Sequence, residues 1–387
     1  MRRRWVERLA IGVMLASTPM ALADQPLADQ PLADQPLADQ PLAGQPLADQ
    51  PLADQPLADQ PLAPDVVVDL SARLLDGGSA GETWDVSASF TGGFRFFVRF
   101  WVTNEGPGSH TAIAMGYFVR PDGRIAQFRY GRTRNHWRSG AAGRFLKVAS
   151  AVLDLRAPSG AVEIDTNRGG MKIYLRFDIP PVLPPLCARR GADARFDVLR
   201  LQQHVEGIAW VAGMAAPIAA NGSIDITHTW GAASEIDTVL RRIDAAGRKG
   251  DLAFFATASV PPNDRGHATS CVAVVDGGKR IYESQTTTVE VAATPLDGTA
   301  GGYPVPSHIA FHTDDLELTV RPSRELLRVN PLDTVPQPFR LLLGLRSSPR
   351  RAWTEASWQL DLRTGKNHEV RKRDDHGLAA VGYTNEP

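Results

Sequence analysis

Eight near-identical copies of a five-residue unit, Asp-Gln-Pro-Leu-Ala, run from Asp24 to Ala63. Each unit offers one Leu and one Ala for burial, and its proline interrupts any regular backbone hydrogen-bond ladder. We therefore expect residues 24–64 to be a disordered linker, with the folded domains after it. Two interpretations of the repeats stay open: a tether, and a repeat expansion without a role.

The residues before the repeats have the three parts of a secretory signal peptide. Arg2–Arg4 make a basic start, Leu9–Ala16 is a short apolar run, and Ala21–Ala23 is a small-residue cleavage site. The apolar run is shorter than the ~20 residues that a membrane helix needs. We predict a signal peptide over residues 1–23, export to the periplasm or outside the cell, and no integral membrane segment after cleavage. An uncleaved anchor is the alternative.

Charge and cysteine content narrow the classes of partner. The chain has 42 Lys and Arg against 43 Asp and Glu, and the part after the repeats is weakly positive. Such a balance does not favour nucleic acid or an anionic membrane as partner. Cys187 and Cys271 are the two cysteines. Paired in an oxidising compartment, they would close a loop of about 84 residues and add up to ~4 kcal/mol of stability. Two buried thiols are the alternative.

Apolar residues alternate with polar ones along the body of the chain. Met171–Ile179 places apolar side chains on one face of a strand and polar ones on the other. Phe94–Val102 does the same, but Phe97 and Trp101 make its second face apolar too. That strand suits a wall that is core on one side and packed or ligand-facing on the other. The pattern predicts an all-β fold of two antiparallel β-barrels, or barrel-like sandwiches, in tandem.

Glycine-containing turns and a proline-rich run organise these strands. The turns that predict hairpins are Thr91–Gly93, Pro121–Gly123 and Asp276–Gly278. The run Pro180–Pro185 predicts a domain division near residue 200, with a first β-barrel domain over residues 65–200 and a second over residues 201–387. One short helix is expected over Ser234–Gly247, where apolar residues recur at helical spacing.

Metal and cofactor sites have little support in the sequence. The nine histidines are scattered, and His308 with His312, near Asp314 and Asp315, is the densest group. These residues flank a proline-rich loop, so we interpret them as solvated side chains. Nucleophile elbows, phosphate-binding glycine loops and nucleotide fingerprints are absent from the sequence. We predict no metal and no cofactor.

One segment, Gly222–Gly231, carries residues suited to chemistry. His228 and Trp230 are two residues apart and share one face of a strand, whereas Asp225 lies on the other face. Imidazole exchanges protons near neutral pH, and an indole face stabilises cations. The alternative is that both rings fill a core and that the imidazole bonds a backbone carbonyl.

The chain resembles the two-domain lipocalin-like proteins, which include the carotenoid 1,2-hydratases and the AttH proteins. Glu82–Gly131, with Trp84, the Phe-rich strand and the sequences Val102-Thr103-Asn104 and Pro121-Asp122-Gly123, resembles the first barrel of that family. The His-x-Trp-Gly sequence within Gly222–Gly231 is similar to a motif of the second barrel. The resemblance covers most of residues 65–387.

The resemblance implies a pocket but departs from the hydratases at one point. In those enzymes a His and a Trp line the pocket, and a Tyr-x-Asp pair on a neighbouring strand supplies the proton. The nearest equivalent here is Phe255-Ala256-Thr257, and threonine is not acidic enough to replace a carboxylic acid. The resemblance thus implies ligand binding without hydration. The ligand-binding residues that it implies are His228, Trp230, Phe255 and Thr257.

Three functions fit these observations. The first is an exported protein that binds a lipophilic small molecule, either isoprenoid-like or a lipid. The second is a cofactor-independent hydratase or cyclase acting on an isoprenoid or polyketide-like substrate. It would need a carboxyl group beside His228, and its weak catalytic candidates are His228, Asp225 and Asp251. The third is a surface interaction module on a repeat stalk, which would show exposed aromatic residues and no cavity.

We predict that the mature protein begins at Asp24, because Ala21–Ala23 is the small-residue cleavage site. The intact mass of the exported protein should equal that of residues 24–387. A mass that still includes residues 1–23 would contradict the prediction.

Overall fold

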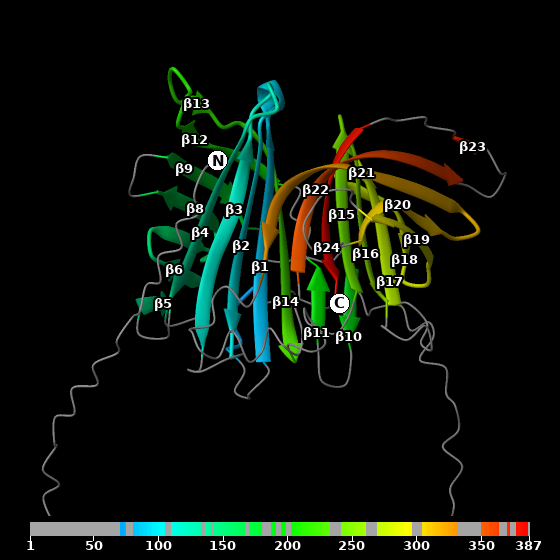
Figure 1. The fold of residues 1–387 in the computed structure, drawn as a ribbon, viewed down its shortest axis with the longest axis horizontal. Helices are drawn as coiled ribbons and strands as arrows, with labels where there is room; N and C mark the ends of the chain where they lie inside the picture. Colours follow the sequence, from blue (N-terminus) through cyan, green and yellow to red (C-terminus); the bar gives the residue numbers. More distant parts are fainter. Residues whose placement is uncertain are drawn as a thin grey trace, which may run out of the picture. The chain divides into compact units, whose positions relative to one another are not determined.

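The computed structural model describes residues 70–74, 80–104, 110–132, 136–140, 143–166, 170–179, 187–190, 195–198, 203–232, 241–260, 269–295, 304–330, 350–363, 370–371 and 377–385. Their regular elements are antiparallel strands and one short 3-10 turn, η1 (Thr91–Gly93), so the all-β fold is confirmed (Figure 1). Within this part of the chain, no helix has the length and apolar character that a bilayer crossing requires.

The first sheet has 14 strands and curls into a nearly closed barrel. Its main path runs β4-β3-β2-β1-β14-β12-β9-β8-β7-β6-β5, with β10, β11 and β13 as side branches. The strands are β1 (Ala80–Phe90), β2 (Arg95–Thr103), β3 (Thr111–Val119), β4 (Ile125–Arg132), β5 (Trp137–Ser139), β6 (Phe145–Val148), β7 (Ala151–Asp154), β8 (Ser159–Asp165), β9 (Met171–Asp178), β10 (Cys187–Arg190), β11 (Arg195–Val198), β12 (Gln203–Val211), β13 (Ile218–Ala219) and β14 (Gly222–Ala232).

The second sheet has ten strands and forms a half-barrel. Its path runs β18-β17-β16-β15-β24-β22-β21-β20-β19, and β23 pairs with β22. The strands are β15 (Arg241–Lys249), β16 (Leu252–Val260), β17 (Thr269–Asp276), β18 (Lys279–Ser284), β19 (Thr288–Pro295), β20 (Pro304–His312), β21 (Leu316–Val329), β22 (Arg350–Arg363), β23 (Val370–Arg371) and β24 (Gly377–Asn385).

The first sheet extends past residue 200, where the sequence placed the division. Strands β12 and β14 belong to it, and the second sheet begins with β15 at Arg241. The physical reason is strand pairing: β14 pairs with β1 along its whole length, from Ala80 opposite Ala232 to Phe90 opposite Gly222. The change of sheet therefore falls within residues 233–240, which lie outside the described part, as do residues 180–186 of the proline-rich run.

The helix predicted over Ser234–Gly247 is wrong for its second half. Residues 241–249 form strand β15, which pairs with β16 on one side and β24 on the other. Ile243 and Ala245 enter the core of the second sheet, while Arg242 and Asp244 lie on the opposite face. Pairing on both edges and a period of two override the helical spacing.

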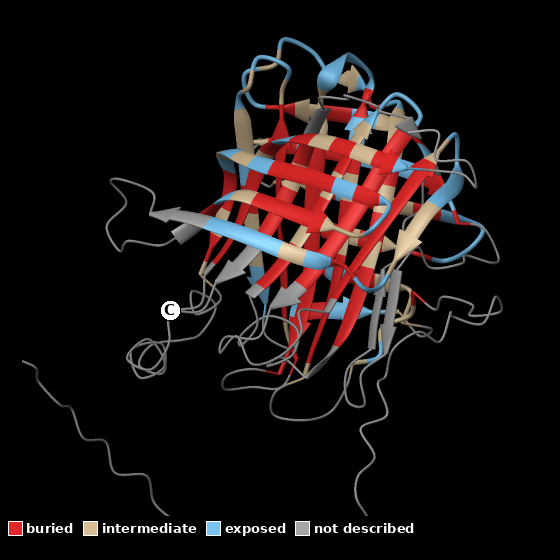
Figure 2. Ribbon diagram, turned by 90° about the vertical axis from the view of Figure 1, so that its right-hand side faces the viewer, coloured by how far each residue is buried: buried red, intermediate tan, exposed pale blue. Residues whose placement is uncertain are grey.

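Strand β2 is buried on both faces, as its sequence predicted. Phe96, Val98 and Phe100 lie in the core of the first sheet, and Phe97 and Trp101 pack with residues of the second sheet. Figure 2 shows buried positions interrupted by intermediate and exposed ones along the strands that face the viewer. The second face of β2 is therefore an interface between the two sheets.

The cysteine of the second sheet is oxidised to a disulfide. Cys271, on β17, is disulfide-bonded, and Cys187, at the start of β10, is the other cysteine of the sequence. Strand β10, a branch of the first sheet, lies against β17 of the second. Of the two alternatives that the sequence left open, the paired form is the one found.

Candidate ligand site between the two sheets

The two sheets meet through an apolar group of side chains, the interface cluster. Its buried members are Phe97, Trp101, Ile113, Met115, Tyr117, Val119, Leu326, Leu327, Val329 and Trp353. The ring of Phe97 lies 5.3 Å from that of Tyr117 and 5.3 Å from that of Trp353, measured between centroids. Burial raises the pKa of the Tyr117 phenol, which therefore stays neutral. Strands β2 and β3 supply one side of this cluster, and β21 and β22 the other.

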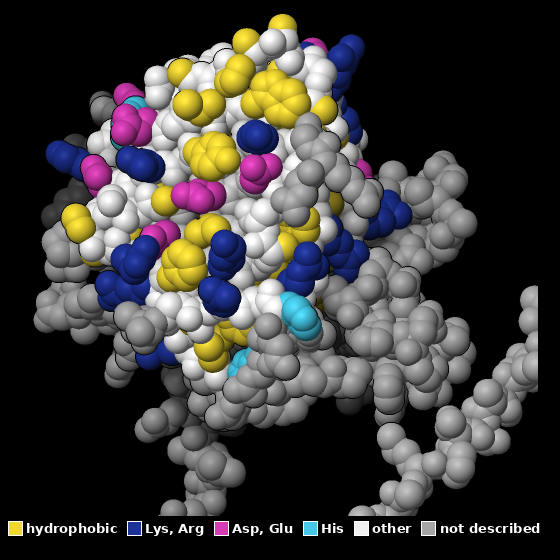
Figure 3. Space-filling view, turned by 90° about the vertical axis from the view of Figure 1, so that its left-hand side faces the viewer, with side chains coloured by type: hydrophobic (Ala, Val, Ile, Leu, Met, Phe, Trp, Pro, Cys, Tyr) yellow, Lys and Arg dark blue, Asp and Glu magenta, His cyan; other side chains and the backbone are white. Residues whose placement is uncertain are grey.

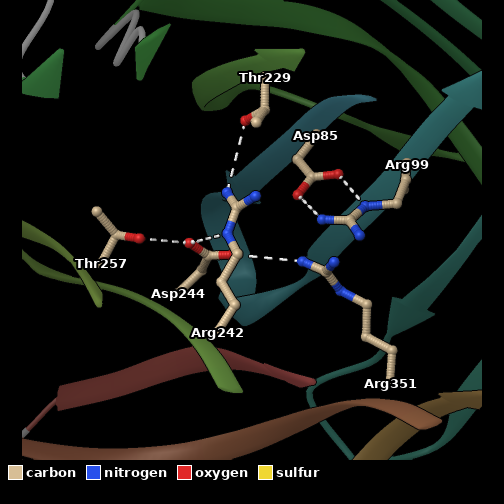
Figure 4. Close-up of polar contacts among 7 residues, drawn as sticks. All are labelled: Asp85, Arg99, Thr229, Arg242, Asp244, Thr257 and Arg351. Atoms are coloured by element: carbon tan, nitrogen blue, oxygen red, sulfur yellow. Dashed lines mark hydrogen bonds and ion pairs between the residues drawn. The ribbon is translucent and has the colours of Figure 1, made fainter. Parts of the chain in front are cut away.

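Beside the interface cluster, charged side chains from both sheets form the ion network (Figure 4). Its members are Asp85, Arg99, Arg242, Asp244 and Arg351. Arg99 donates two hydrogen bonds to Asp85, and its exposed fraction is 0%. The Asp244 carboxylate forms ion pairs with the guanidinium groups of Arg242, at 3.0 Å, and Arg351, at 3.2 Å. Buried charges are tolerated only when they are paired in this way.

Trp353 joins the ion network to the interface cluster. The guanidinium carbons of Arg99 and Arg351 each lie 5.1 Å from the centre of its ring. An indole attracts cations at this distance, and the attraction is stronger where water is excluded. Arg99 comes from the first sheet and Arg351 from the second, so one aromatic ring fixes two cations of opposite sheets.

Asp244 is held in its ionised form. Burial, the largest influence, would raise its pKa, but the guanidinium groups of Arg242 and Arg351, a 2.8 Å hydrogen bond from Thr257 and the charge of Arg99 oppose it. The net effect is a pKa below the usual range of an aspartic acid. At neutral pH this group is therefore a hydrogen-bond acceptor and not a proton donor.

A cavity of about 50 Å³ lies against the ion network. Its lining is aromatic on one part and carries carboxylates and hydroxyls on another. The lining residues are Asp85, Ser87, Phe97, Asp225, Thr227, Asp244, Ala245, Ala246, Phe255, Trp353, Ala380 and Gly382. Apolar walls with a few polar groups are typical of small-molecule sites. The volume accepts a water-sized group, and a larger ligand requires side chains to move.

Strand β14 presents different residues on its two faces. Asp225 and Thr227 line the cavity, and the hydroxyl of Thr229 accepts a 3.5 Å hydrogen bond from Arg242. His228 lies on the other face, because side chains alternate along a strand. The sequence predicted this separation of Asp225 from His228, but it placed both in the second barrel, whereas β14 belongs to the first sheet.

On that other face, four side chains form the His228 box: Glu82, Trp84, His228 and Trp230. The Nε2 atom of His228 lies 2.7 Å from Oε1 of Glu82, and both residues are buried. The imidazole ring lies between the two indoles, with centroids 4.6 Å from each. The imidazole thus has a carboxyl group as a hydrogen-bond partner.

Residues Leu70–Leu74, which precede β1 and the rest of the described domains, are here called the terminal strap. Their backbone amides hold the Glu82 carboxylate. The amide of Arg73 lies 2.9 Å from both carboxylate oxygens, and the amide of Leu74 lies 2.9 Å from Oε2. The Arg73 guanidinium carbon lies 5.3 Å from the Trp230 ring centre. The strap therefore covers the His228 box, and Glu82 keeps the strap in place.

The residues that the sequence selected divide between three places. His228 and Trp230 share the His228 box, whereas Phe255 lines the cavity with Asp225. Thr257 donates a hydrogen bond to Asp244, which lines the same cavity. Asp251 is exposed in the turn between β15 and β16. The structure thus separates the implied ligand-binding set, and the binding role of its members stays a prediction. Among the described residues, no three His, Cys, Asp or Glu side chains gather closely enough to hold a metal ion.

Sequence reasoning missed the ion network. Arg99 lies inside the Phe-rich strand, on the face of Phe97 and Trp101, where a charge is unexpected. The position of Arg99 on this apolar face could have indicated the network, because a buried arginine needs a partner from a neighbouring strand. Glu82 and Trp84 have the same two-residue spacing as His228 and Trp230, and the two pairs lie on adjacent strands. This repeated spacing could have indicated the His228 box.

The sequence matches no protein-family model and no curated protein. Solved structures do match. An AttH-like protein from Nitrosomonas europaea has a TM-score of 0.58 at 11% identity, covering 84% of this chain and 98% of its own. CghA has a TM-score of 0.56 at 13% identity, covering 85% and 96%. Kievitone hydratase from Nectria haematococca has a TM-score of 0.52 at 9% identity, covering 79% and 88%.

The chain has the tandem lipocalin-like fold of these proteins. The family resemblance inferred from the sequence is thereby confirmed at the level of the fold. Identities of 9–13% carry no residue roles, so the function of this chain depends on its own site.

We predict that Asp244→Asn lowers the free energy of unfolding by about 3–5 kcal/mol, because it leaves Arg242 and Arg351 buried without their shared carboxylate. The matched control is Asp154→Asn, which removes a carboxylate paired with the exposed Arg156 and should cost much less. Urea unfolding measures both. Equal losses would contradict a structural role of the network.

The pH dependence follows from the lowered pKa of Asp244. A pKa that is lower in the folded state stabilises the protein at pH values above the unfolded-state pKa. This stabilisation is lost as the pH falls through the folded-state pKa. Asp244→Asn should therefore show a shallower loss of stability in acid than the unaltered protein.

Proposed function

We propose that this chain is an exported protein that binds a lipophilic small molecule between its two sheets. The observation that carries the proposal is the cavity itself, with Phe97, Phe255 and Trp353 on its walls and the Asp85 and Asp225 carboxylates beside them. The aromatic walls suit an apolar body. The carboxylates and the Ser87 and Thr227 hydroxyls suit a polar end that donates hydrogen bonds.

The size of the cavity limits how such a ligand enters. Ligand sites usually enclose about 300–1,000 Å³, far more than the 50 Å³ found here. The polar end of a ligand fits the existing space, and the apolar body needs Phe255 and Trp353 to turn or the sheets to separate. Because Arg242 bonds Thr229 and Arg95 pairs with Glu355 across the two sheets, we expect side-chain rotation to supply the room.

Two further observations support binding. Asp244 is ionised at neutral pH, so this carboxyl of the cavity does not supply the proton that hydration requires. One solved structure with this fold is CghA with Sch210972, at 13% identity. That complex concerns another protein, and it supports a ligand-binding role for the shared fold.

The interaction-module alternative has less support. On the face shown in Figure 3, hydrophobic side chains are dispersed among lysines, arginines and acidic residues. Dispersed apolar side chains are normal for a protein surface, whereas docking sites show a continuous patch. Export rests on the signal-like residues 1–23, which lie outside the described part of the chain.

A second candidate function, acid–base catalysis, is favoured by the His228 box. An enzyme of the hydratase or cyclase kind would need a carboxyl group beside His228, and Glu82 is that group, at 2.7 Å. A carboxylate that holds an imidazole in this way can orient it for proton transfer. In this chain the terminal strap covers the pair, so a substrate reaches it only if the strap moves.

We predict that Ala246→Leu weakens ligand binding at least tenfold, because the longer side chain fills the cavity. The matched control, Ala292→Leu, makes the same change at an exposed position of the same sheet and should bind normally. Native mass spectrometry of protein purified from its host identifies the retained molecule, and titration gives its affinity. If no lipophilic molecule is retained and none from a panel binds, binding at this cavity is refuted.

We predict that Glu82→Gln separates the two candidate functions. If the protein only binds, this variant should keep the affinity of the unaltered chain, because Glu82 does not line the cavity. If it catalyses, turnover of the retained molecule should fall at least tenfold while binding persists. A variant that loses affinity, while its thermal unfolding is unchanged, would contradict the location of the binding site.

A further inference from the structure

A second hollow lies at one end of the first barrel, beside its β3–β4 turn. Its volume is about 390 Å³, and it shares no lining residue with the smaller cavity. The residues of this mouth groove are Phe94, Arg120, Pro121, Asp122, Met214, Ala215 and Ala216. Phe94 directly follows η1, residues 120–122 belong to the β3–β4 turn, and residues 214–216 lie between β12 and β13 (Figure 1).

The apolar wall of the mouth groove continues into the barrel core. Phe94 is half-buried, and its ring lies 5.8 Å from that of Phe118, which is fully buried and stacks with Phe90. Met214 faces the same hollow and is also half-buried. A thioether side chain adapts to ligands of irregular shape. An apolar chain placed here would thus contact the Phe94 ring and the Met214 thioether on one side.

The polar part of the groove is the Arg120–Asp122 ion pair, and Asp122 also lies 3.7 Å from Arg124. Arg120 lies 2.9 Å from Asp122 and donates a 3.2 Å hydrogen bond to the carbonyl of Gly213. The Asp122 side chain is 43% exposed, so this pair is weak and a carboxylate brought by a ligand can replace Asp122 at little cost. The Gly213 carbonyl keeps the guanidinium aimed at the groove while that exchange occurs.

The groove is preformed. Hydrogen bonds close two of its loops, from the Gly123 amide to the Arg120 carbonyl at 2.9 Å and from the Met214 amide to the Val211 carbonyl at 3.0 Å. The third loop turns at Gly92, whose φ of 81° favours glycine. A site that exists before the ligand arrives loses little entropy on binding.

We propose that the mouth groove binds an amphipathic anion, with a short acyl chain against Phe94 and Met214 and its carboxylate on Arg120. The volume is near the lower end for ligand sites, and it accommodates one short acyl chain. Barrel mouths are a recurrent place for such ligands. The site is independent of the cavity between the sheets, so each can be tested without the other.

The experiment is a titration of the full chain with decanoate, followed by NMR of ¹³C-methyl methionine. Met214→Leu assigns the Met214 signal. We expect that signal to shift saturably, while those of the buried Met115 and Met171 stay in place. Phe94→Ala should weaken decanoate binding about tenfold, because it removes the main apolar contact.

Decanol, which has the same chain without the charge, tests the role of Arg120. Arg120→Gln should weaken decanoate binding about tenfold and leave decanol binding unchanged, and the exposed control Arg138→Gln should alter neither. Ala246→Leu, which fills the other cavity, should also leave decanoate binding intact. A Met214 signal that does not shift, or an Arg120→Gln variant that binds decanoate normally, would overturn the proposal.

Discussion

The burial of β2 on both faces is the constraint on which the rest of the structure depends. Its first face, with Phe96 and Phe100, fills the first barrel, so its second face must find another partner or remain an exposed apolar surface. The second sheet supplies that partner through Trp353 and its neighbours. Two sheets that could each form a core are therefore held face to face, and the cavity exists because their packing is incomplete between Phe97 and Phe255.

Burying that face carries a cost, because Arg99 lies on it between two aromatic residues. A guanidinium removed from water needs fixed partners, and here they come from Asp85, from the ring of Trp353 and from the field of Asp244. Replacing the network by apolar residues could leave stability unchanged, but it would remove the polar wall of the cavity. The charges thus specify which surfaces meet and give the site its chemistry, more than they add stability.

Much of the fold could be predicted from the sequence, and less of the site. Alternation along Met171–Asp178 recurs as alternating burial, because one face of a strand meets the core and the other meets water. The segment Arg241–Gly247 was misjudged, since pairing with β16 and β24 is a long-range effect that local spacing does not contain. The ion network was missed for the same reason: Arg99 and Asp244 are far apart in the chain, and only the docking of the sheets joins them.

Strands β1 and β14 connect the two candidate functions. Glu82 and His228 lie on their barrel side, whereas Asp85 and Asp225 line the cavity on their other side. The strands pair residue by residue over their full length. Neither the Glu82–His228 pair nor the Asp85–Asp225 pair can therefore move without moving the backbone that carries the other pair. A substitution that disturbs this pairing would damage both sites and reveal nothing about either. Side-chain changes that keep the pairing act on one face alone, and only they can assign binding and proton transfer to separate residues.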